Sequence, residues 1–584
     1  MCFGATCPTC SGKSWRGCGS HIPSALAGVP EKQWCTCEPR VTVDGKAYPP
    51  SAKMALPGLS WLGSIFGSGG GQVTGNTNTK IRLLNLAPLF ATWLSPLLSS
   101  LLTNAPLLII MPTPPAISKP KLDSIKVPFK MLLLNPLVLA ITCFALSVLY
   151  VWRCITSPLR SLPGPRISLF SSWLLKYHEF HAHRTRYVHS LHQRYGPVVR
   201  IAPNEVSFAS LEGVKEIYGS GGSGYDKTEF YNLFTIYGRR TMFSTLKKED
   251  HAKRKRILAD RYANTNILKS ESLHGITERS KRFVERCSRF AGGSIDIFDE
   301  EIMKQVTFDD SLQNRLVEYY NPSLHKLIGN VLSLFAKPRK TPLADDLVMS
   351  ASAKTGPAQF TLLSRMQDKN YEMEHIDMAA ECLDHMAAGI DTTGDALCFL
   401  MWEISQPRSF YVQQRLQEEL RTNPEAAFDR LPYLDAVVME GLRCFPAIPM
   451  SLPRYVPSGG RTIDGYYIPD RTIVSCQAYS THRIDETVFP HPDTFDPDRW
   501  LQETGELDRK RLFFAFASGG RGCIGKHLAL AEMKTLLRDV YSRYTTVPDP
   551  SMGAEDMEMS DQLISSQPRG KKCLLTLIPL ENGV

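Results

Sequence analysis

The most uniformly apolar stretch of the chain covers residues 131–152. It contains no charged side chain and is about as long as the ~20 residues that a helix needs to cross a bilayer. Tyr150 and Trp152 lie at its end, where amphipathic aromatic side chains favour the membrane interface. Arg153 and Arg160 follow, and basic residues beside a span favour the cytosolic side. The pattern predicts a single transmembrane anchor with the downstream domain in the cytosol; a buried core helix is the alternative.

The residues before this anchor show a different pattern. Residues 56–80 are rich in Gly, Ser, Asn and Thr, as in a flexible linker. Residues 83–111 are apolar but are interrupted by prolines, which break a helix. We therefore treat residues 56–130 as a linker with an apolar segment that lies at an interface or does not fold, rather than as a second span.

Downstream of the anchor the periodicity is mainly helical. Apolar residues recur at helical spacing in residues 376–404 and 431–445, and a basic helical stretch covers residues 247–262. Residues 198–208 alternate around Pro-Asn, which is typical of a short hairpin. The sequence predicts a mainly α domain with a small β-rich part over residues 153–584.

Composition narrows the class of protein. Hydrophobic residues make up 43% of the 584 residues, enough for a sizeable core, and the net charge is +9. No Lys/Arg run interleaved with aromatic residues is found, so nucleic acid is not predicted as a partner. A mildly basic surface suits an anionic membrane or an acidic redox partner.

Cysteines are concentrated at the N-terminus, where six of the 15 fall within the first 37 residues. The remaining ones are scattered singly, as in a protein that faces the reducing cytosol. Pairs of soft ligands a few residues apart can hold a tetrahedral Zn²⁺ ion, although loose thiols or disulfides are the alternative. Residues 1–55 also resemble small Cys-rich eukaryotic proteins with a Gly-Cys-Gly-x-His-Ile-Pro-Ser stretch. The candidate zinc ligands are Cys7, Cys10, Cys18, His21, Cys35 and Cys37.

One glycine-rich loop near the C-terminus carries a single cysteine. It reads Phe-Ala-Ser-Gly-Gly-Arg-Gly-Cys-Ile-Gly over residues 516–525, and an apolar helical pattern follows. Glycines allow positive φ angles and close approach of a bulky group. A thiolate at the mouth of a helix is stabilised by the helix dipole and by nearby cations. Cys523 is therefore a candidate axial ligand of a metal whose opposite face stays open.

The loop resembles the haem-binding loop of the cytochrome P-450 family. The fixed positions of Phe-x-x-Gly-x-Arg-x-Cys-x-Gly are Phe516, Gly519, Arg521, Cys523 and Gly525, and all match. The resemblance extends over roughly residues 131–584. It implies the cytochrome P-450 fold, a large helical domain with a small β-rich subdomain, and haem b bound through Cys523.

A second motif of the same family lies in the predicted helix over residues 376–404. It reads Ala-Ala-Gly-Ile-Asp-Thr-Thr, in which a glycine and two threonines weaken the middle of an apolar helix. The resemblance implies that this helix opens over the haem, and that Asp391 and Thr392 deliver protons there. An ordinary satisfied Asp–Thr pair is the alternative.

Further cations and one ion-pair motif complete the set of predicted site residues. By resemblance, the haem propionates contact His251, Lys255, Arg454 and Arg521, with lysine at 255 where the family usually has arginine. Residues three apart share a helix face, so a Glu-x-x-Arg pair can form an ion pair. The resemblance implies that this pair and an arginine downstream lock the segment before the cysteine loop. These residues are Glu440, Arg443 and Arg499.

The resemblance implies a monooxygenase that inserts one oxygen atom from O₂ into a small apolar organic substrate. Because no flavin or nucleotide fingerprint is found, electrons are expected from a separate NADPH-cytochrome P-450 reductase. The expected location is the endoplasmic reticulum membrane. The alternatives are a haem-thiolate isomerase, dehydratase or peroxygenase that does not use O₂ and reductase, and a zinc-dependent interaction module with a vestigial oxidase domain.

Overall fold

The computed structural model describes two parts of the chain. The first is residues 3–49, with gaps at 8–9, 11, 17–21, 38–39 and 44–45. The second is residues 136–580, with gaps at 220–223, 299–311, 335–341, 355, 358–359, 369 and 372. The chain divides into two compact units, residues 1–120 and residues 121–584. The segment 56–130, including the apolar stretch 83–111, lies outside the described residues.

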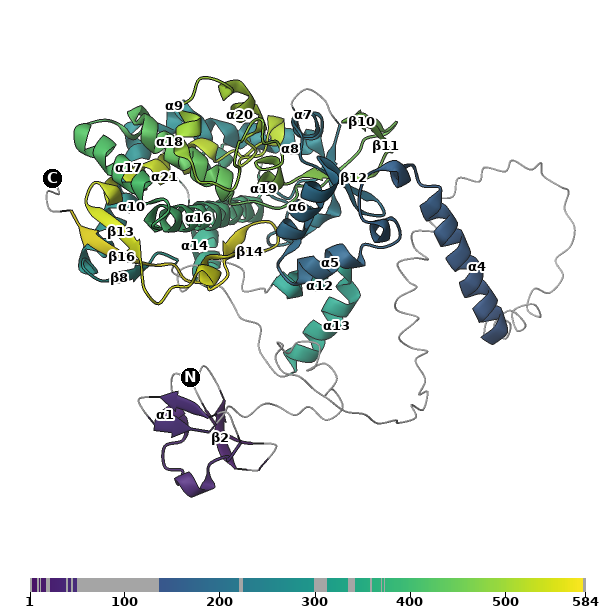
Figure 1. The fold of residues 1–584 in the computed structure, drawn as a ribbon, viewed down its shortest axis with the longest axis horizontal. Helices are drawn as coiled ribbons and strands as arrows, with labels where there is room; N and C mark the ends of the chain where they lie inside the picture. Colours follow the sequence, from purple (N-terminus) through teal and green to yellow (C-terminus); the bar gives the residue numbers. More distant parts are fainter. Residues whose placement is uncertain are drawn as a thin grey trace, which may run out of the picture. The chain divides into compact units, whose positions relative to one another are not determined.

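The described part of the N-terminal unit consists of short strands, a short helix and turns (Figure 1). Strand β1 (Phe3–Thr6) pairs antiparallel with β2 (Lys13–Arg16), and β3 (Val41–Val43) pairs antiparallel with β4 (Lys46–Tyr48). Helix α1 (Ile22–Ala25) and the 3-10 turn η1 (Glu31–Gln33) connect them. The core of this unit comprises Ile22, Leu26, Trp34 and Tyr48.

Helix α4 (Pro136–Ile155) is the apolar helix that the sequence predicts, although it begins later and ends later than residues 131–152. Residues 131–135 lie outside the described part. Its large apolar side chains are exposed; Phe144 is 72% and Trp152 is 64% accessible. Only 6% of the most apolar 18 residues is buried, so the alternative of a buried core helix is wrong for α4.

Helices form the main core of the larger unit. The long helix α16 (His375–Ser405) packs with α17 (Phe410–Thr422), α18 (Pro432–Cys444) and α21 (Lys526–Tyr541), and α21 also packs with α10 (Ser270–Arg289). Their shared core holds Leu400, Val437 and Leu537 among its fully buried members. The predicted helices over 376–404 and 431–445 are thereby confirmed as α16 and α18.

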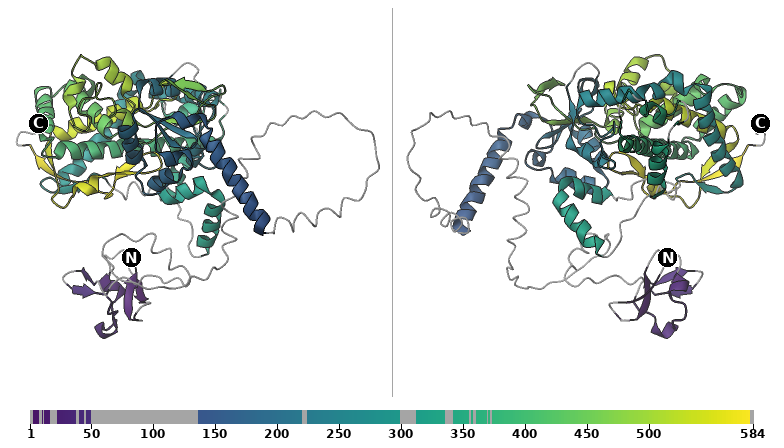
Figure 2. Two further views of the ribbon diagram at one scale, coloured as in Figure 1. Left: turned by 45° about the vertical axis from the view of Figure 1, so that its right-hand side comes forward. Right: turned by 180° about the vertical axis from the view of Figure 1, so that it is seen from behind.

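Two sheets flank this helical core. The larger has the strand order β5-β6-β12-β9-β7 and contains β5 (Val198–Ala202) and β6 (Glu205–Phe208), which confirms the predicted hairpin at 198–208. Its other strands are β12 (Ile473–Cys476), β9 (Arg454–Tyr455) and β7 (Asp226–Lys227). The second sheet has the order β13-β16-β8, with β13 (Tyr544–Pro548), β16 (Leu574–Pro579) and β8 (Ser294–Asp296). Both views in Figure 2 place the yellow C-terminal strands at one end of the larger unit.

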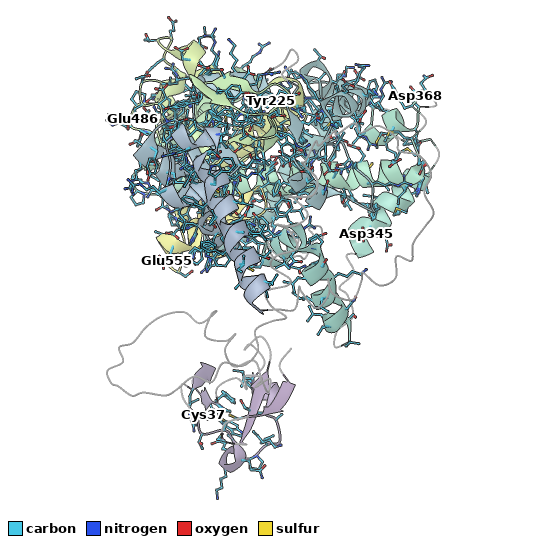
Figure 3. All side chains as sticks on the ribbon, turned by 90° about the vertical axis from the view of Figure 1, so that its right-hand side faces the viewer. Cys37, Tyr225, Asp345, Asp368, Glu486 and Glu555 are labelled. Atoms are coloured by element: carbon cyan, nitrogen blue, oxygen red, sulfur yellow. The ribbon has the colours of Figure 1, made fainter. Side chains whose placement is uncertain are left out.

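The remaining elements surround this frame, and Figure 3 shows Tyr225, which is fully buried, among the packed side chains of the larger unit. The remaining helices are α5 (Trp173–Phe180), α6 (Arg184–Tyr195), α7 (Leu211–Tyr218), α8 (Lys248–Leu258), α9 (Asn264–Ile267), α12 (Leu312–Tyr320), α13 (Pro322–Ser333), α14 (Pro342–Ala353), α15 (Leu362–Met366), α19 (Ala478–Thr481) and α20 (Glu506–Leu512). The 3-10 turns are η3 (Pro158–Ser161), η4 (Arg166–Leu169), η5 (Glu229–Phe234), η6 (Ala259–Tyr262), η7 (Phe428–Arg430), η8 (Pro497–Trp500), η9 (Gly519–Arg521) and η10 (Ala554–Met557). Two small hairpins are formed by β10 (Arg461–Ile463) with β11 (Tyr466–Ile468), and by β14 (Met559–Asp561) with β15 (Ser566–Pro568).

Candidate active site

The cysteine loop is a tight backbone turn that ends in helix α21. Ala517 and Gly519 adopt positive φ angles of 54° and 66°, just before and at the first residue of the 3-10 turn η9. The Cys523 amide donates to the Phe516 carbonyl at 2.8 Å and closes the loop. A Cβ at Gly525 would lie 3.9 Å from the Cys523 Sγ, so glycine leaves room beside the thiol.

The thiol of Cys523 faces open space while protein surrounds it. Its side chain is exposed, yet desolvation raises the pKa of the thiol above its usual value. The amides of Gly525 and Lys526 and the ammonium of Lys255 act in the opposite direction, since they favour the thiolate. The Cys523 thiol is therefore accessible although protein surrounds much of it.

Helix α16 is also accessible at the predicted second motif, although the helix is buried on either side of it. Its residues near Leu383 and beyond Asp395 are buried, but Ala388 and Gly389 between them are exposed. A Cβ built on Gly389 would meet no atom within 4 Å. The Thr392 hydroxyl donates to the Ala388 carbonyl at 2.7 Å, a bond that competes with the regular helix ladder. The motif therefore opens α16 onto empty space.

The acidic residue of this motif is half-buried, and one of its carboxylate oxygens is buried without a partner. Asp391 Oδ1 makes no hydrogen bond, and desolvation raises the pKa of this carboxyl to about 6. One turn later Asp395 is only 4% exposed, and its Oδ1 is also unpartnered. Desolvation, and then repulsion from Asp391, raises the pKa of Asp395 well above its usual value. Sequence analysis missed Asp395; its spacing of four from Asp391 is the only signal that points to it.

Four cationic or titratable side chains gather in the interior beside the cysteine loop. They are His251, Lys227, Arg454 and Arg521. Burial and then the charge of Lys227 lower the pKa of His251 to about 3. Burial and then Arg454 lower the pKa of Arg521 to about 10. Lys227, which sequence analysis missed, has a pKa well below its usual value for the same reasons.

Several donors of this cluster have no partner. His251 Nδ1, Arg454 Nε and Arg521 Nη1 are buried and unbonded. Other donors of the two arginines are used, since Arg454 Nη1 donates to the Tyr231 hydroxyl at 2.7 Å and Arg521 Nη2 donates to the Tyr225 carbonyl. Because an unpaired buried donor is costly, the cluster is built for an anion that supplies the missing acceptors.

Lys255 contacts the backbone of the cysteine loop. Its ammonium donates to the carbonyls of Gly520 at 3.0 Å and Gly522 at 2.8 Å, within the cysteine loop. Lys255 thus fastens helix α8 to the loop. A direct propionate contact of Lys255 stays a prediction.

Glu440 forms the centre of a buried ion-pair network. Its carboxylate accepts from Arg443 Nε at 2.8 Å and from Arg499 Nε at 3.0 Å, and from Trp500 Nε1 at 2.9 Å. Burial would raise the pKa of Glu440, but the two arginines outweigh it and hold the pKa below its ordinary value. Arg443 also donates to the carbonyls of His482 and Pro492, so the network joins α18 to the segment that leads into the cysteine loop.

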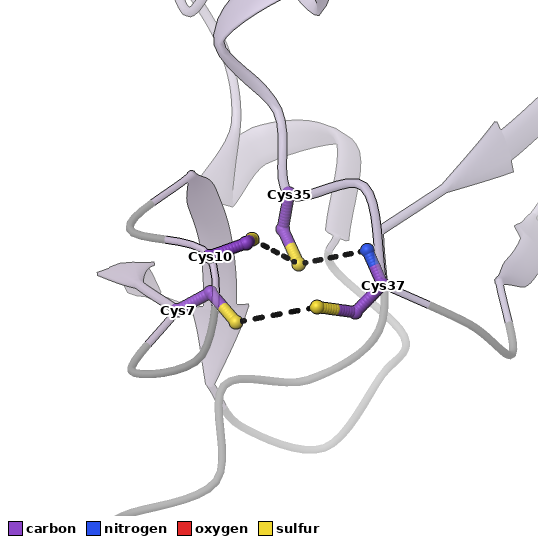
Figure 4. A group of neighbouring side chains, drawn as sticks. All are labelled: Cys7, Cys10, Cys35 and Cys37. Atoms are coloured by element: carbon purple, nitrogen blue, oxygen red, sulfur yellow. Dashed lines mark hydrogen bonds between the residues drawn. The ribbon is translucent and has the colours of Figure 1, made fainter.

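Four of the N-terminal cysteines converge in the smaller unit. Figure 4 shows Cys7, Cys10, Cys35 and Cys37 pointing at one another, and their Sγ atoms all lie within 4.8 Å of one another. The cluster is thus able to share one metal ion. Cys18 and His21, the other predicted ligands, lie outside the described residues.

Comparison with known proteins decides the family. A family model described as Cytochrome P450 matches residues 325–574. "Cytochrome P450 monooxygenase stcB" of Emericella nidulans is 31% identical over 72% of this chain and 89% of its own length. The chain belongs to the cytochrome P450 family. "Cytochrome P450 monooxygenase orf2" of Aspergillus niger is 29% identical over 75% of this chain and 97% of its own. "Cytochrome P450 monooxygenase tazI" of Aspergillus terreus is 29% identical over 73% and 95%.

Family membership makes this chain a monooxygenase and implies a haem group, and the site fits it. Cys523 offers one accessible thiol as an iron ligand, and the unpartnered polar atoms of His251, Arg454 and Arg521 offer partners for two carboxylates. Residues 1–45 match a different model, described as Domain of unknown function (DUF8730), which is consistent with a separate N-terminal unit.

Proposed function

We propose that this cytochrome P450 is a membrane-anchored monooxygenase that inserts one oxygen atom from O₂ into a small apolar organic substrate. The observation that carries this proposal is the accessible, desolvated thiol of Cys523 beside a buried set of unpartnered cations. Bound haem would supply the reduction and cleavage of O₂ and the oxygen insertion. Electrons come from a separate NADPH-cytochrome P450 reductase.

Each site residue then has a definite role. Cys523 would hold the haem iron, and the amides of Gly525 and Lys526 favour its thiolate form. His251, Arg454 and Arg521 would hold the haem propionates through the polar atoms that lack partners in the protein. Phe516 and Gly519 shape the loop, and Glu440, Arg443 and Arg499 keep its approach rigid.

Proton delivery falls to α16. A carboxyl with a pKa of about 6 can both hold and release a proton near neutral pH, and Asp391 has such a pKa. The Thr392 hydroxyl lies on the next position and has only the Ala388 carbonyl as an acceptor, so it is free to accept a hydrogen bond. These two groups supply protons at the open part of the helix.

The ligand role of Cys523 is tested by spectroscopy of the purified full chain. The reduced carbon monoxide complex should show the long-wavelength Soret band of a thiolate-ligated haem, and Cys523→Ala should lose it. Cys382→Ala is the matched control, because Cys382 packs near Ile524 but is not in the loop. Persistence of the band in Cys523→Ala would overturn the assignment.

A haem-thiolate isomerase, dehydratase or peroxygenase is the alternative. Unlike the proposed monooxygenase, it would not need proton delivery by Asp391 and Thr392. Thr392→Ala should lower the product formed per NADPH consumed, whereas Thr393→Ala, its neighbour, should not. Equal coupling in both variants would favour the alternative.

We also propose the following organisation of the chain. Residues 1–55 form a Cys-rich module, 56–130 a linker with an apolar segment, 131–152 the anchor and 153–584 the haem domain. The exposed apolar surface of α4 supports insertion into the endoplasmic reticulum membrane, and Arg153 and Arg160 support a haem domain on the cytosolic side.

For the N-terminal module we propose that the metal shared by its cysteines is zinc. Zn²⁺ prefers thiolate ligands in tetrahedral geometry, and four cysteines complete its coordination.

A further inference from the structure

Two sulfur–sulfur distances in the N-terminal unit suit a shared metal ion better than two disulfides. The Sγ atoms of Cys7 and Cys37 are 3.9 Å apart, and those of Cys10 and Cys35 are 3.3 Å apart. A disulfide requires about 2.05 Å between sulfurs. Four thiolates about 2.3 Å from one zinc ion lie about 3.8 Å from one another, close to the observed distances.

The backbone brings the two halves of the cluster together (Figure 4). Cys7 and Cys10 lie in the turn between β1 and β2, and the segment that holds Cys35 and Cys37 packs against this hairpin, with the Cys35 amide donating to the Lys13 carbonyl at 2.7 Å. A Cβ at Gly12 would lie 2.6 Å from the Cys35 Cα, so only glycine permits this approach.

One of the sulfurs is also supported by the main chain. The Cys37 amide donates to the Cys35 Sγ at 3.4 Å. Such an N–H···S contact stabilises negative charge on sulfur, which a thiolate ligand carries and a disulfide does not.

Among the described residues of this unit, the apolar core is small. It consists of Ile22, Leu26, Trp34 and Tyr48, with Trp34 stacked on Tyr48 at 5.2 Å between ring centroids. Its strands are three or four residues long. Units of this size generally need disulfides or a metal to fold.

We infer that one zinc ion held by Cys7, Cys10, Cys35 and Cys37 is a structural part of the N-terminal unit, and that residues 3–49 lose their fold without it. Four protein ligands leave no open position, so the ion is structural and not catalytic. Cys18 and His21 are not required as ligands. This inference rests on the zinc binding proposed above.

The ligand set is tested by metal content of the full-length holoprotein purified under reducing conditions. We expect one zinc per chain, in addition to the haem iron. Cys7→Ser, Cys10→Ser, Cys35→Ser and Cys37→Ser should each reduce zinc content severalfold, while Cys18→Ser and His21→Ala, the matched controls, should keep it. Exchange with Co²⁺ should give the intense thiolate-to-cobalt absorption of a tetrahedral site in the parent and in the two controls. The four ligand variants should lack this absorption.

The structural role is tested on the same samples by amide hydrogen exchange. Removing zinc with a chelator should abolish protection in residues 3–49, and protection in the haem domain together with its carbon monoxide band should stay unchanged. If no zinc or cobalt binds, or if mass spectrometry finds disulfides between these cysteines, the zinc proposal itself fails. If zinc binds but its removal leaves protection in residues 3–49 intact, only the structural inference fails. Loss of zinc in Cys18→Ser or His21→Ala would show that the ligand set is wrong.

Discussion

At the scale of single residues, the unpartnered donors of Arg454 and Arg521 distinguish this interior from an ordinary core. Most buried polar groups are hydrogen-bonded, yet both guanidinium groups keep a free N–H beside the cysteine loop. Their mutual repulsion, visible in the lowered pKa of Arg521, adds to the cost. An interior of this kind is stabilised when the bound ligand is dianionic.

Arg454→Met should therefore weaken haem retention. Loss of one charge-assisted hydrogen bond costs about 1.5–3 kcal/mol, so transfer of haem to an acceptor protein should become roughly tenfold to a hundredfold faster. Arg454→Lys keeps the charge, so its rate of haem transfer should fall between those of the parent and Arg454→Met. Arg461→Met, in the nearby hairpin strand β10, is the control and should release haem at the parental rate. Equal rates in all three variants would contradict a propionate role for Arg454.

Asp391 makes stability depend on pH in a definite direction. Its pKa is about 6 in the folded protein and near 4 when unfolded, so the folded state holds a proton that the unfolded state has released. The stability from this group is complete below about pH 4 and is lost as pH rises through about 6. Asparagine does not ionise, so Asp391→Asn should keep this stability at high pH. Above pH 7 its free energy of unfolding should exceed that of the parent by up to about 3 kcal/mol, and at pH 4 the two should differ little.

Thermal unfolding of both proteins between pH 4 and 8 measures this difference. Asp508→Asn, an exposed carboxyl on α20, should follow the parent at every pH. A constant offset between Asp391→Asn and the parent across the range would show that Asp391 titrates normally.

At the scale of elements, the periodicity of apolar residues predicted those helices and strands whose formation depends on local sequence. The apolar repeat predicted α16 and α18, and alternation around Pro203 predicted the β5–β6 hairpin. The network centred on Glu440 was predicted only through resemblance, because residues 59 apart in sequence meet in space. Lys227 and Asp395 were missed, since their importance comes from neighbours on other elements or from burial, neither of which a repeat encodes.

Gly389, in the middle of α16, is a poor helix former at a position where alanine would favour the helix. Gly389→Ala should raise helix stability by about 1 kcal/mol, because alanine is the better helix former and its Cβ would meet no atom within 4 Å. The same methyl group would enter the hollow at the open part of the helix. We expect unchanged or higher thermal stability with severalfold weaker binding of apolar ligands, measured by spectral titration of the haem.

Gly394→Ala provides the matched control. Gly394 lies in the same helix and its Cβ would also meet no atom within 4 Å, so the gain in helix stability is shared. Five residues further along, it lies on a different side of α16. If Gly389→Ala binds apolar ligands as tightly as Gly394→Ala does, the hollow at Gly389 is not part of the ligand site.

At the scale of the whole molecule, the chain combines two compact units with an apolar helix at the start of the described part of the larger one. The small unit and the haem domain match different family models. The sequence predicted this division from cysteine spacing and hydropathy. It could not predict which of the six candidate ligands converge, because convergence of Cys7 with Cys37 depends on the folded hairpins.

Helix α4 exposes large apolar side chains, and the proposed membrane anchor can be tested directly on them. Phe144 and Val148 are 72% and 50% exposed near the middle of α4. Charged residues there oppose insertion by about 2.5–3.5 kcal/mol each. The double variant Phe144→Arg, Val148→Arg should therefore lose resistance to alkaline carbonate extraction from microsomes, while its carbon monoxide spectrum stays intact. Leu507→Arg, which charges an exposed apolar position on α20, should extract like the parent. If the double variant remains carbonate-resistant, the anchor is not α4, and the apolar residues 83–111 become the segment to substitute next.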